Sequence, residues 1–250
     1  YHRSFSVVRE AAKDIPVFGN IGAAEVARLK DASKVQRLAD LIHADGFAVH
    51  LTPLQEFLQP EGSPDFRGVL RGIEMLVKGL NIPVIVKEIG AGISANVAKR
   101  LIDGGVKIID VAGAGGTSWA GVEILRRKNE NGKSKNGKVG ESFASKFWDW
   151  GIPTVDALRQ VSSLKSQTPG LTVISSGGIN GGMEIAKSIA FGADLAGAAR
   201  PMLKALETGG TKALMQKIDS WMMEVKGAMF LTGSRTIAEL QNQQLIIRPQ

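Results

Sequence analysis

The chain has 250 residues, of which 44% are apolar and 22% charged, so it can form one sizeable core and has a globular composition. It contains no cysteine, which excludes a disulfide framework, a cysteine zinc site and a cysteine nucleophile, and fits a reducing cytoplasm. The net charge of +7 suits an anionic small molecule or a nucleic acid. No apolar run reaches the roughly 18 residues needed to span a bilayer, and a membrane partner is not expected.

Apolar residues along the chain alternate between helical and strand-like patterns. A first helix is predicted at residues 4–13. Short apolar runs then predict buried strands at residues 15–21, 47–51, 83–87, 108–112, 171–175 and 193–199. Apolar stripes at helical spacing predict helices at residues 31–42, 66–80, 94–102, 118–127, 154–164, 179–192 and 214–229. Asp31, Ser94 and Thr154 are the expected N-caps.

Strands that alternate with helices indicate right-handed βαβ units and a parallel sheet. We therefore predict a single α/β domain over residues 1–250 with the architecture of a TIM (β/α)8 barrel. The barrel needs eight strands and the pattern supplies six, so about six of eight βα units are expected in this chain. Pro53 cannot donate to a sheet, and the segment that follows it to Gly62 is expected to be a loop.

Residues 126–138 hold six basic residues, one acid and no apolar residue. This composition predicts a solvated, flexible basic loop, which we place at residues 128–140. The alternative interpretation is a lid over an anionic substrate. The segment has no interleaved aromatic residues, so a nucleic-acid partner is not expected.

Polar side chains occur at or just after the ends of the predicted strands. They are Asn20, His50, Gln55, Lys87 and Thr117. Each alone could serve the local structure, as Lys87 would by pairing with Glu88. Together they would meet on one face of a closed barrel, where the carboxyl ends of the strands form active sites, and polar groups gathered there need a ligand or one another.

Two further features point to an anionic ligand. Gly177, Gly178 and residues 196–199 follow the last two strands, where barrels of this type bind phosphate through backbone N–H groups. A plain tight turn is the alternative for the glycine pair. Glu56 is a candidate Mg²⁺ ligand, since Mg²⁺ takes one or two carboxylates together with substrate phosphate; a surface acid is the alternative.

Several of these segments, taken in order, resemble type 2 isopentenyl-diphosphate isomerases, which are FMN-dependent barrel enzymes. The most specific is the string His-Leu-x-Pro-x-Gln-Glu at residues 50–56, followed by Gln-Pro-Glu-Gly at residues 59–62. The other matching segments are residues 19–22, 84–88, 110–117, 149–154, 176–179 and 231–233.

The resemblance implies a role for each matching residue. Gln55 would be the catalytic residue at the alkene end of the substrate, His50 and Thr52 would bind the diphosphate, and Glu56 would bind Mg²⁺. The implied FMN contacts are Asn20, Lys87, Thr117, Gly177, Gly178, Ala198 and Ala199. The implied reaction is the reversible conversion of isopentenyl diphosphate to dimethylallyl diphosphate, with FMN kept reduced by NADPH. A homotetramer or larger homo-oligomer is also implied.

The sequence departs from the family in two places. Thr52 stands where the family has asparagine, and a shorter hydroxyl would weaken one diphosphate contact or replace it by water. The family also carries two βα units upstream that do not occur in this chain, which explains the two missing strands. These departures motivate a second hypothesis, a catalytically inactive flavin-binding or assembly protein.

A third hypothesis is an FMN-dependent 2-hydroxy acid oxidase, since such barrels share the phosphate end. It requires a catalytic histidine late in the barrel, close to an arginine. The histidines here, His2, His43 and His50, all precede position 51, so the oxidase is disfavoured.

Overall fold

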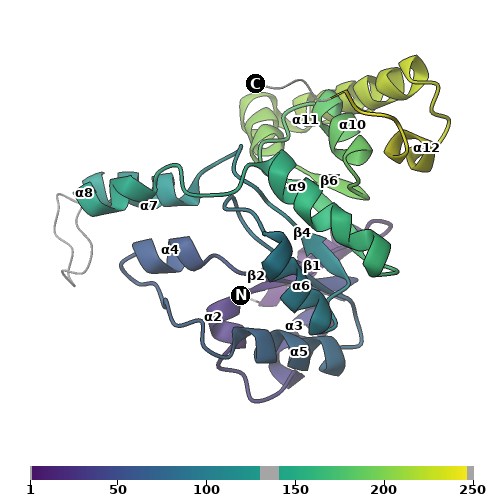
Figure 1. Ribbon diagram of the computed structural model, residues 1–250. Coiled ribbons are helices and arrows are strands. Elements are labelled where there is room, and N and C mark those ends of the chain that lie inside the picture. The colour runs from purple at the N-terminus through teal and green to yellow at the C-terminus, as the bar shows by residue number, and fades with distance from the viewer. Residues whose placement is uncertain (1, 130–140, 247–250) are drawn as a thin grey trace.

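The computed structural model describes residues 2–129 and 141–246 (Figure 1). Its strands form one parallel sheet in chain order, and they are β1 Phe18–Gly22, β2 Gly46–His50, β3 Val84–Lys87, β4 Ile108–Asp110, β5 Thr172–Ser176 and β6 Leu195–Gly197. Neighbours in the sheet are thus neighbours in the chain, joined by helical crossovers. This arrangement confirms the predicted α/β fold with six consecutive units of a (β/α)8 barrel.

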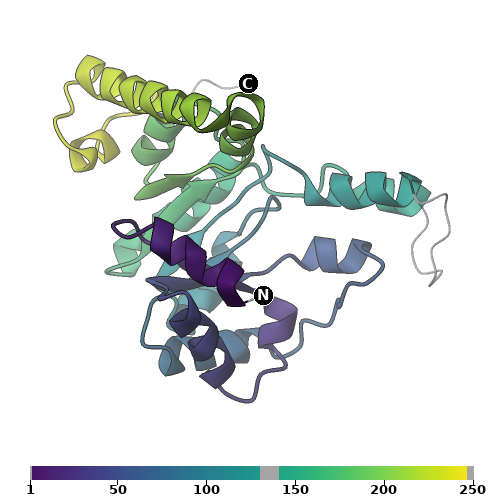
Figure 2. The ribbon, with the colours of Figure 1, turned by 180° about the vertical axis from the view of Figure 1, so that it is seen from behind.

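The helices lie mainly on one face of this sheet. They are α1 His2–Ala11, α2 Ala23–Val26, α3 Ser33–Leu41, α4 Pro53–Leu58, α5 Val69–Gly79, α6 Ala95–Asp103, α7 Trp119–Asn129, α8 Glu141–Ala144, α9 Thr154–Ser162, α10 Gly182–Ala190, α11 Arg200–Leu231 and α12 Ile237–Gln241. Two 3₁₀ turns, Ser145–Phe147 and Ser163–Gln167, complete the described elements. Along the outer face α2, α5, α6 and α9 contact one another in succession (Figure 1). From behind, α1 is seen beside the β1 side of the sheet, where it packs on α3 (Figure 2).

The core lies between the sheet and these helices, because alternate strand residues point to opposite faces. Val49, Val86 and Ile109 are fully buried toward the helices and belong to one cluster with Ile73 and Leu76 of α5. Burying each such side chain contributes about 1.5–3 kcal/mol, so this layer holds the sheet in shape. The opposite face lines a hollow, and that hollow carries the polar residues.

The strands at the two edges of the described sheet leave apolar side chains in the open. Phe18 on β1 is 53% exposed and Leu195 on β6 is 55% exposed. Phe18 lines the same face of the sheet as Ala48, and Leu195 is in register with Ile174, which lines that face as well. A closed barrel would cover both edge positions. The open edges are therefore consistent with a sheet that holds part of a ring.

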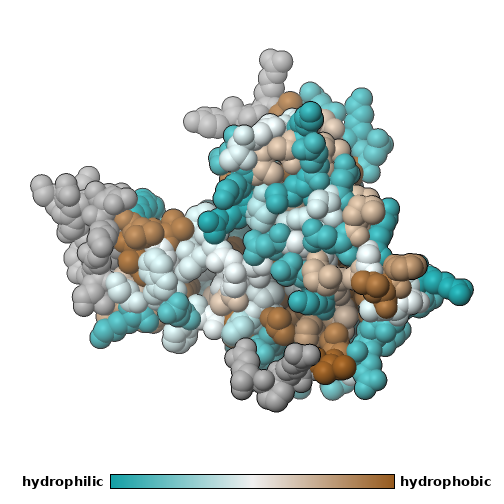
Figure 3. Space-filling view, turned by 90° about the horizontal axis from the view of Figure 1, so that it is seen from above, coloured by the Kyte–Doolittle hydropathy of each residue, from teal (hydrophilic) through white to brown (hydrophobic). Residues whose placement is uncertain are grey.

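Helices α7 and α8 form an arm that extends away from the sheet (Figure 1). A small cluster of Leu58, Ala120, Ile124 and Ala144 packs α4 against this arm. Apolar side chains remain exposed on it, among them Leu125 and Phe143, and brown side chains gather on the arm in Figure 3. The arm therefore holds α4, the helix that carries Gln55 and Glu56.

Three local predictions need correction. The segment after Pro53 is helix α4, because proline at the first helical position has the required φ and needs no acceptor for an N–H. Thr154 is the first residue of α9 and Pro153 occupies the N-cap, whereas the predicted cap at Ser94 is confirmed by its acceptance from the Val97 N–H. Asp31 precedes the N-cap residue of α3 by one position and accepts from the Ser33 N–H.

Residues 128 and 129 of the predicted basic loop at 128–140 belong to α7, which ends at Asn129. The rest of that prediction, residues 130–140, lies outside the described part of the chain. Among the described residues no helix combines the length and the apolar character that a membrane crossing requires.

Candidate functional site

The register of the sheet places three polar side chains in one row. His50 on β2 pairs with Lys87 on β3, and Lys87 pairs with Asp110 on β4. Because strand residues in register point to the same face, all three side chains line a hollow of about 480 Å³ on the face opposite the outer helices. Asn20, Thr52 and Gln55 line it as well. The sheet thus brings together the predicted substrate residues His50, Thr52 and Gln55 and two of the predicted flavin residues, Asn20 and Lys87.

Asp110 is a buried acid that the sequence predictions did not assign. One of its carboxylate oxygens accepts from the Ser176 hydroxyl at 2.7 Å and the Ala112 N–H at 3.2 Å, and the other lies 4.0 Å from Lys87 Nζ. Lys87 Nζ also donates to the Glu88 carbonyl at 2.5 Å. Burial raises the pKa of Asp110, while the Lys87 ammonium and the Ser176 hydroxyl act in the opposite direction. Asp110 therefore faces the ammonium of Lys87 and helps hold it toward the hollow.

Replacing Ser176 by alanine is expected to destabilise the protein by about 1–2 kcal/mol at pH 8, because the buried Asp110 carboxylate loses a hydrogen-bond donor. The variant raises the folded-state pKa of Asp110 further above its unfolded value. The loss of stability therefore grows as the pH rises through the folded-state pKa values of Asp110 in the two proteins, which lie above 3.8, and shrinks below them, where the folded carboxyl is protonated in both. Urea unfolding at pH 8 and pH 4.5 measures the difference.

Ser175→Ala is the matched control, since the buried Ser175 hydroxyl donates to the Ser188 hydroxyl at 3.0 Å and no charge is involved. The free energy of unfolding that Ser175→Ala loses should be the same at pH 8 and at pH 4.5. An equal loss at the two pH values for Ser176→Ala would show that Asp110 does not depend on that hydroxyl.

His50 is a neutral group at pH 7. Burial and the nearby Lys87 ammonium lower its pKa, while Glu25 and Glu56 act in the opposite direction. The ring nitrogen Nδ1 lies 3.5 Å from the Thr52 hydroxyl. His50 is therefore available as a hydrogen-bond donor or acceptor at the mouth of the hollow.

Thr52 adopts a left-handed backbone conformation, with a φ of 50° and a ψ of 36°. This conformation is rare for a β-branched residue and costs roughly 1–2 kcal/mol, whereas asparagine tolerates it. Thr52→Asn is therefore expected to stabilise the protein by about 1 kcal/mol, as measured by the midpoint of urea unfolding. Thr52→Ser is the control, because it removes the β-branch and keeps the hydroxyl; it should give a smaller gain. A lower midpoint for Thr52→Asn would contradict the strain argument.

Helix α4 places two polar neighbours in different surroundings. Gln55 lines the hollow next to Trp119 of α7, a residue that the sequence predictions did not assign. Glu56 is not among the residues that line this hollow; its carboxylate accepts from the Ser63 N–H at 2.7 Å. The described residues contain no group of three or more potential metal ligands. A single carboxylate suits Mg²⁺ when phosphate oxygens complete its coordination, so the donor set is compatible with the predicted role of Glu56.

A second hollow of about 620 Å³ adjoins the first, and Lys87 lines both. The predicted phosphate residues Gly177, Gly178, Ala198 and Ala199 line it together with Thr117. The two glycines have φ values of 97° and 85°, and a Cβ at Gly177 would come within 2.2 Å of the Gly113 carbonyl oxygen. Only glycine fits here, and it leaves backbone accessible from the hollow.

The adjoining helix ends differ in what they can bind. At the start of α10 the N–H groups of Gly182 and Met183 donate to the Glu224 carboxylate, so that helix terminus already holds an anion. The start of α11, by contrast, contributes Arg200 to the lining of the second hollow. The glycine turns, the small side chains and this basic helix start fit the phosphate end of FMN.

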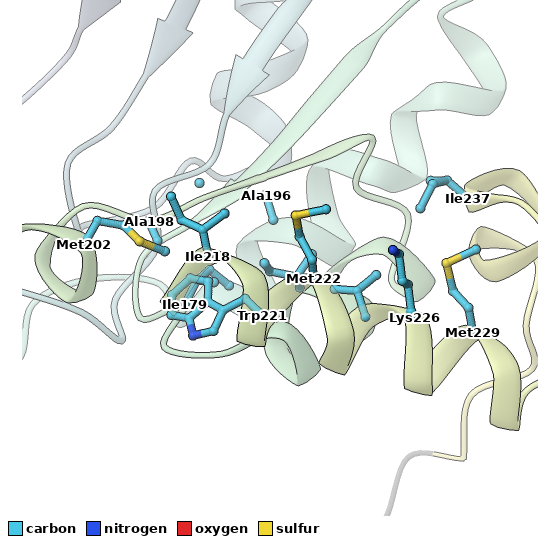
Figure 4. Close-up of a pocket in the computed structure, with 13 residues that line it drawn as sticks. Ile179, Ala196, Ala198, Met202, Ile218, Trp221, Met222, Lys226, Met229 and Ile237 are labelled. Carbon is cyan, nitrogen blue, oxygen red and sulfur yellow. The ribbon is translucent and has the colours of Figure 1, made fainter. Parts of the chain in front are cut away.

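A third hollow of about 510 Å³ lies between β6, α10, α11 and α12 (Figure 4). Its lining is apolar apart from Lys226 and includes Ile218, Trp221 and Met222. It offers neither the amides nor the carboxylates that a diphosphate and its metal need, so the polar hollows along Lys87 are the candidate active site.

Comparison with known proteins gives three findings. The family model for FMN-dependent dehydrogenases matches residues 14–247. The isopentenyl-diphosphate delta-isomerases of Chlorobaculum parvum and Pelodictyon phaeoclathratiforme are 46% and 45% identical to this chain, over 100% of it and 69% of their own lengths. A lactate oxidase structure from Pediococcus acidilactici superposes with a TM-score of 0.66 at 20% identity, over 98% of this chain and 65% of its own, a likeness of fold alone.

Proposed function

The chain belongs to the isopentenyl-diphosphate delta-isomerases within the FMN-dependent dehydrogenase family, and we propose that it interconverts isopentenyl diphosphate and dimethylallyl diphosphate with bound FMN. The observation that carries the proposal is the meeting of the two polar hollows at Lys87. Gln55, His50 and Thr52 line one side, and the glycine turns line the other. One ligand in each hollow would bring the flavin and the prenyl chain together.

Reduced flavin would supply the acid and base that move a proton on and off the prenyl chain, with no net oxidation. Lys87 would hold negative charge on the flavin edge, and Asp110 would keep Lys87 in place. Gln55 would contact the alkene end of the substrate, while His50 and Thr52 would bind the diphosphate. Asn20 and Thr117 would contact the flavin, and residues 177–178 and 198–199 would bind its phosphate.

The remaining assignments rest on the resemblance and on composition. Glu56 would bind Mg²⁺ together with the substrate diphosphate, and NADPH would keep the flavin reduced. The absence of cysteine fits work in the cytoplasm, and a homotetramer or larger assembly is the expected form. Two more βα units would complete the ring between the open edges of β1 and β6.

The test is an assay of the full-length protein with isopentenyl diphosphate, FMN, NADPH and Mg²⁺, read as formation of dimethylallyl diphosphate. Turnover that requires FMN and falls when Mg²⁺ is chelated supports the proposal. A folded protein that binds FMN and forms no product would instead support the inactive flavin-binding or assembly protein.

A further inference from the structure

The hydroxyl of Thr154 lies where two glycine-rich loops meet: the loop after β4, residues 111–118, and the loop after β5, residues 177–181. Thr154 Oγ1 donates to the Gly177 carbonyl oxygen at 2.6 Å, and it lies 3.4 Å from the Ala114 carbonyl oxygen. The Thr154 N–H donates to the same Ala114 carbonyl at 3.1 Å. The first residue of α9 therefore joins the loop after β4 to the loop after β5.

The contact with Gly177 determines where a neighbouring N–H points. The Gly177 carbonyl and the Gly178 N–H belong to one planar peptide unit and point in opposite directions. The next peptide is held in the same way, because Asn180 Nδ2 donates to the Gly178 carbonyl at 2.7 Å. Within the described residues neither the Gly178 N–H nor the Ile179 N–H has a protein acceptor, and both residues line the second hollow. Two successive N–H groups of this kind form an anion-binding concavity.

This arrangement needs an external anchor. Glycine at positions 177 and 178 populates positive and negative φ about equally, so the glycines alone do not fix the direction of the peptide between them. The Thr154 hydroxyl supplies a fixed donor, since it sits on the first turn of a nine-residue helix that packs through Leu158 and Val161 into the core.

We propose that Thr154 is a positioning residue for the cofactor phosphate: by holding the Gly177 carbonyl it turns the Gly178 N–H into the second hollow. The inference rests on the proposed use of FMN and concerns one part of it, the recognition of the 5′-phosphate. Thr154 does not line the hollow, so it acts through the peptide it holds.

The test compares Thr154→Val, which keeps the shape and loses the hydroxyl, with Thr154→Ser, which keeps the hydroxyl. Each purified protein is stripped of flavin and titrated with FMN and with riboflavin, which lacks the phosphate, by flavin fluorescence. Thr154→Val should bind FMN about tenfold more weakly, the effect of about one lost hydrogen bond, with riboflavin affinity unchanged. Thr154→Ser should bind FMN within about threefold of the wild-type protein.

Equal weakening toward both flavins, or no weakening of FMN binding, would overturn the proposal. Serine as poor as valine would overturn it too. Amide hydrogen exchange of the flavin-free protein adds a readout that needs no cofactor, and Thr154→Val should speed exchange of the Gly113 N–H, which donates to the Ser176 carbonyl at 3.0 Å at the base of the loop after β5. If the wild-type protein binds neither flavin, the proposed cofactor is wrong, and the exchange result alone decides whether Thr154 anchors the loop.

Discussion

Replacing Lys87 by methionine is expected to lower kcat for the isomerisation by about 10²–10³-fold, the range for loss of one fixed electrostatic donor in an active site. Lys87 lines both polar hollows, together with Ile89, Asp110 and Trp119, and its ammonium is partly shielded from water beside Asp110. A cation at the edge of the flavin favours the reduced, anionic form. The variant should therefore also lower the midpoint potential of bound FMN, which a redox titration measures independently of turnover.

The same substitution leaves the Asp110 carboxylate buried without its cation. We expect a loss of stability that is larger at pH 8 than at pH 5, because protonation of Asp110 relieves it, and its pKa is already raised by burial. The double variant with Lys87→Met and Asp110→Asn should recover much of the stability and none of the activity. Activity within tenfold of the wild-type protein would exclude Lys87 from the chemistry.

The strands were predictable because strands buried in a parallel sheet leave continuous apolar runs between helical stripes. Their exact ends were not, and the run at residues 193–199 shortened to Leu195–Gly197. Helix α4 was missed because Pro53 ends a strand and begins a helix equally well, and its six residues show too little periodicity to decide. The packing of Leu58 against α7 decides it, and a contact between distant segments leaves no local pattern.

The residues of the candidate site also fall into two groups, those that the sequence could predict and those that it could not. Asn20 lies in the middle of β1, in register with Ala48, and not at the strand end where it was predicted. Residues at strand ends, such as His50 and Lys87, could be found because parallel strands present their carboxyl ends on one side. Asp110 follows the same rule and could have been found by it, since it ends its strand. Thr154 could not, because its hydroxyl binds a carbonyl 23 positions away, and the pattern predicted only a helix cap.

Gly177→Ala is expected to destabilise the protein by roughly 2–5 kcal/mol and to weaken FMN binding by tenfold or more. Two costs add. A side chain at a φ of 97° costs roughly 1–2 kcal/mol, and the new Cβ would meet the Gly113 carbonyl oxygen at 2.2 Å and the Thr154 hydroxyl at 2.9 Å, an overpacking that costs about 1–3 kcal/mol more. Urea unfolding measures the first effect and flavin fluorescence the second.

Gly170→Ala separates these two costs. Gly170 also has a positive φ, 79°, but a Cβ there would meet no atom within 4 Å. Its substitution should cost only the backbone strain of about 1–2 kcal/mol and leave FMN affinity unchanged. If the two variants lose equal stability, the contact with Gly113 is not tight. If Gly177→Ala still binds FMN as the wild-type protein does, the turn after β5 does not bind the phosphate, because its backbone cannot accept a Cβ and keep the same N–H directions.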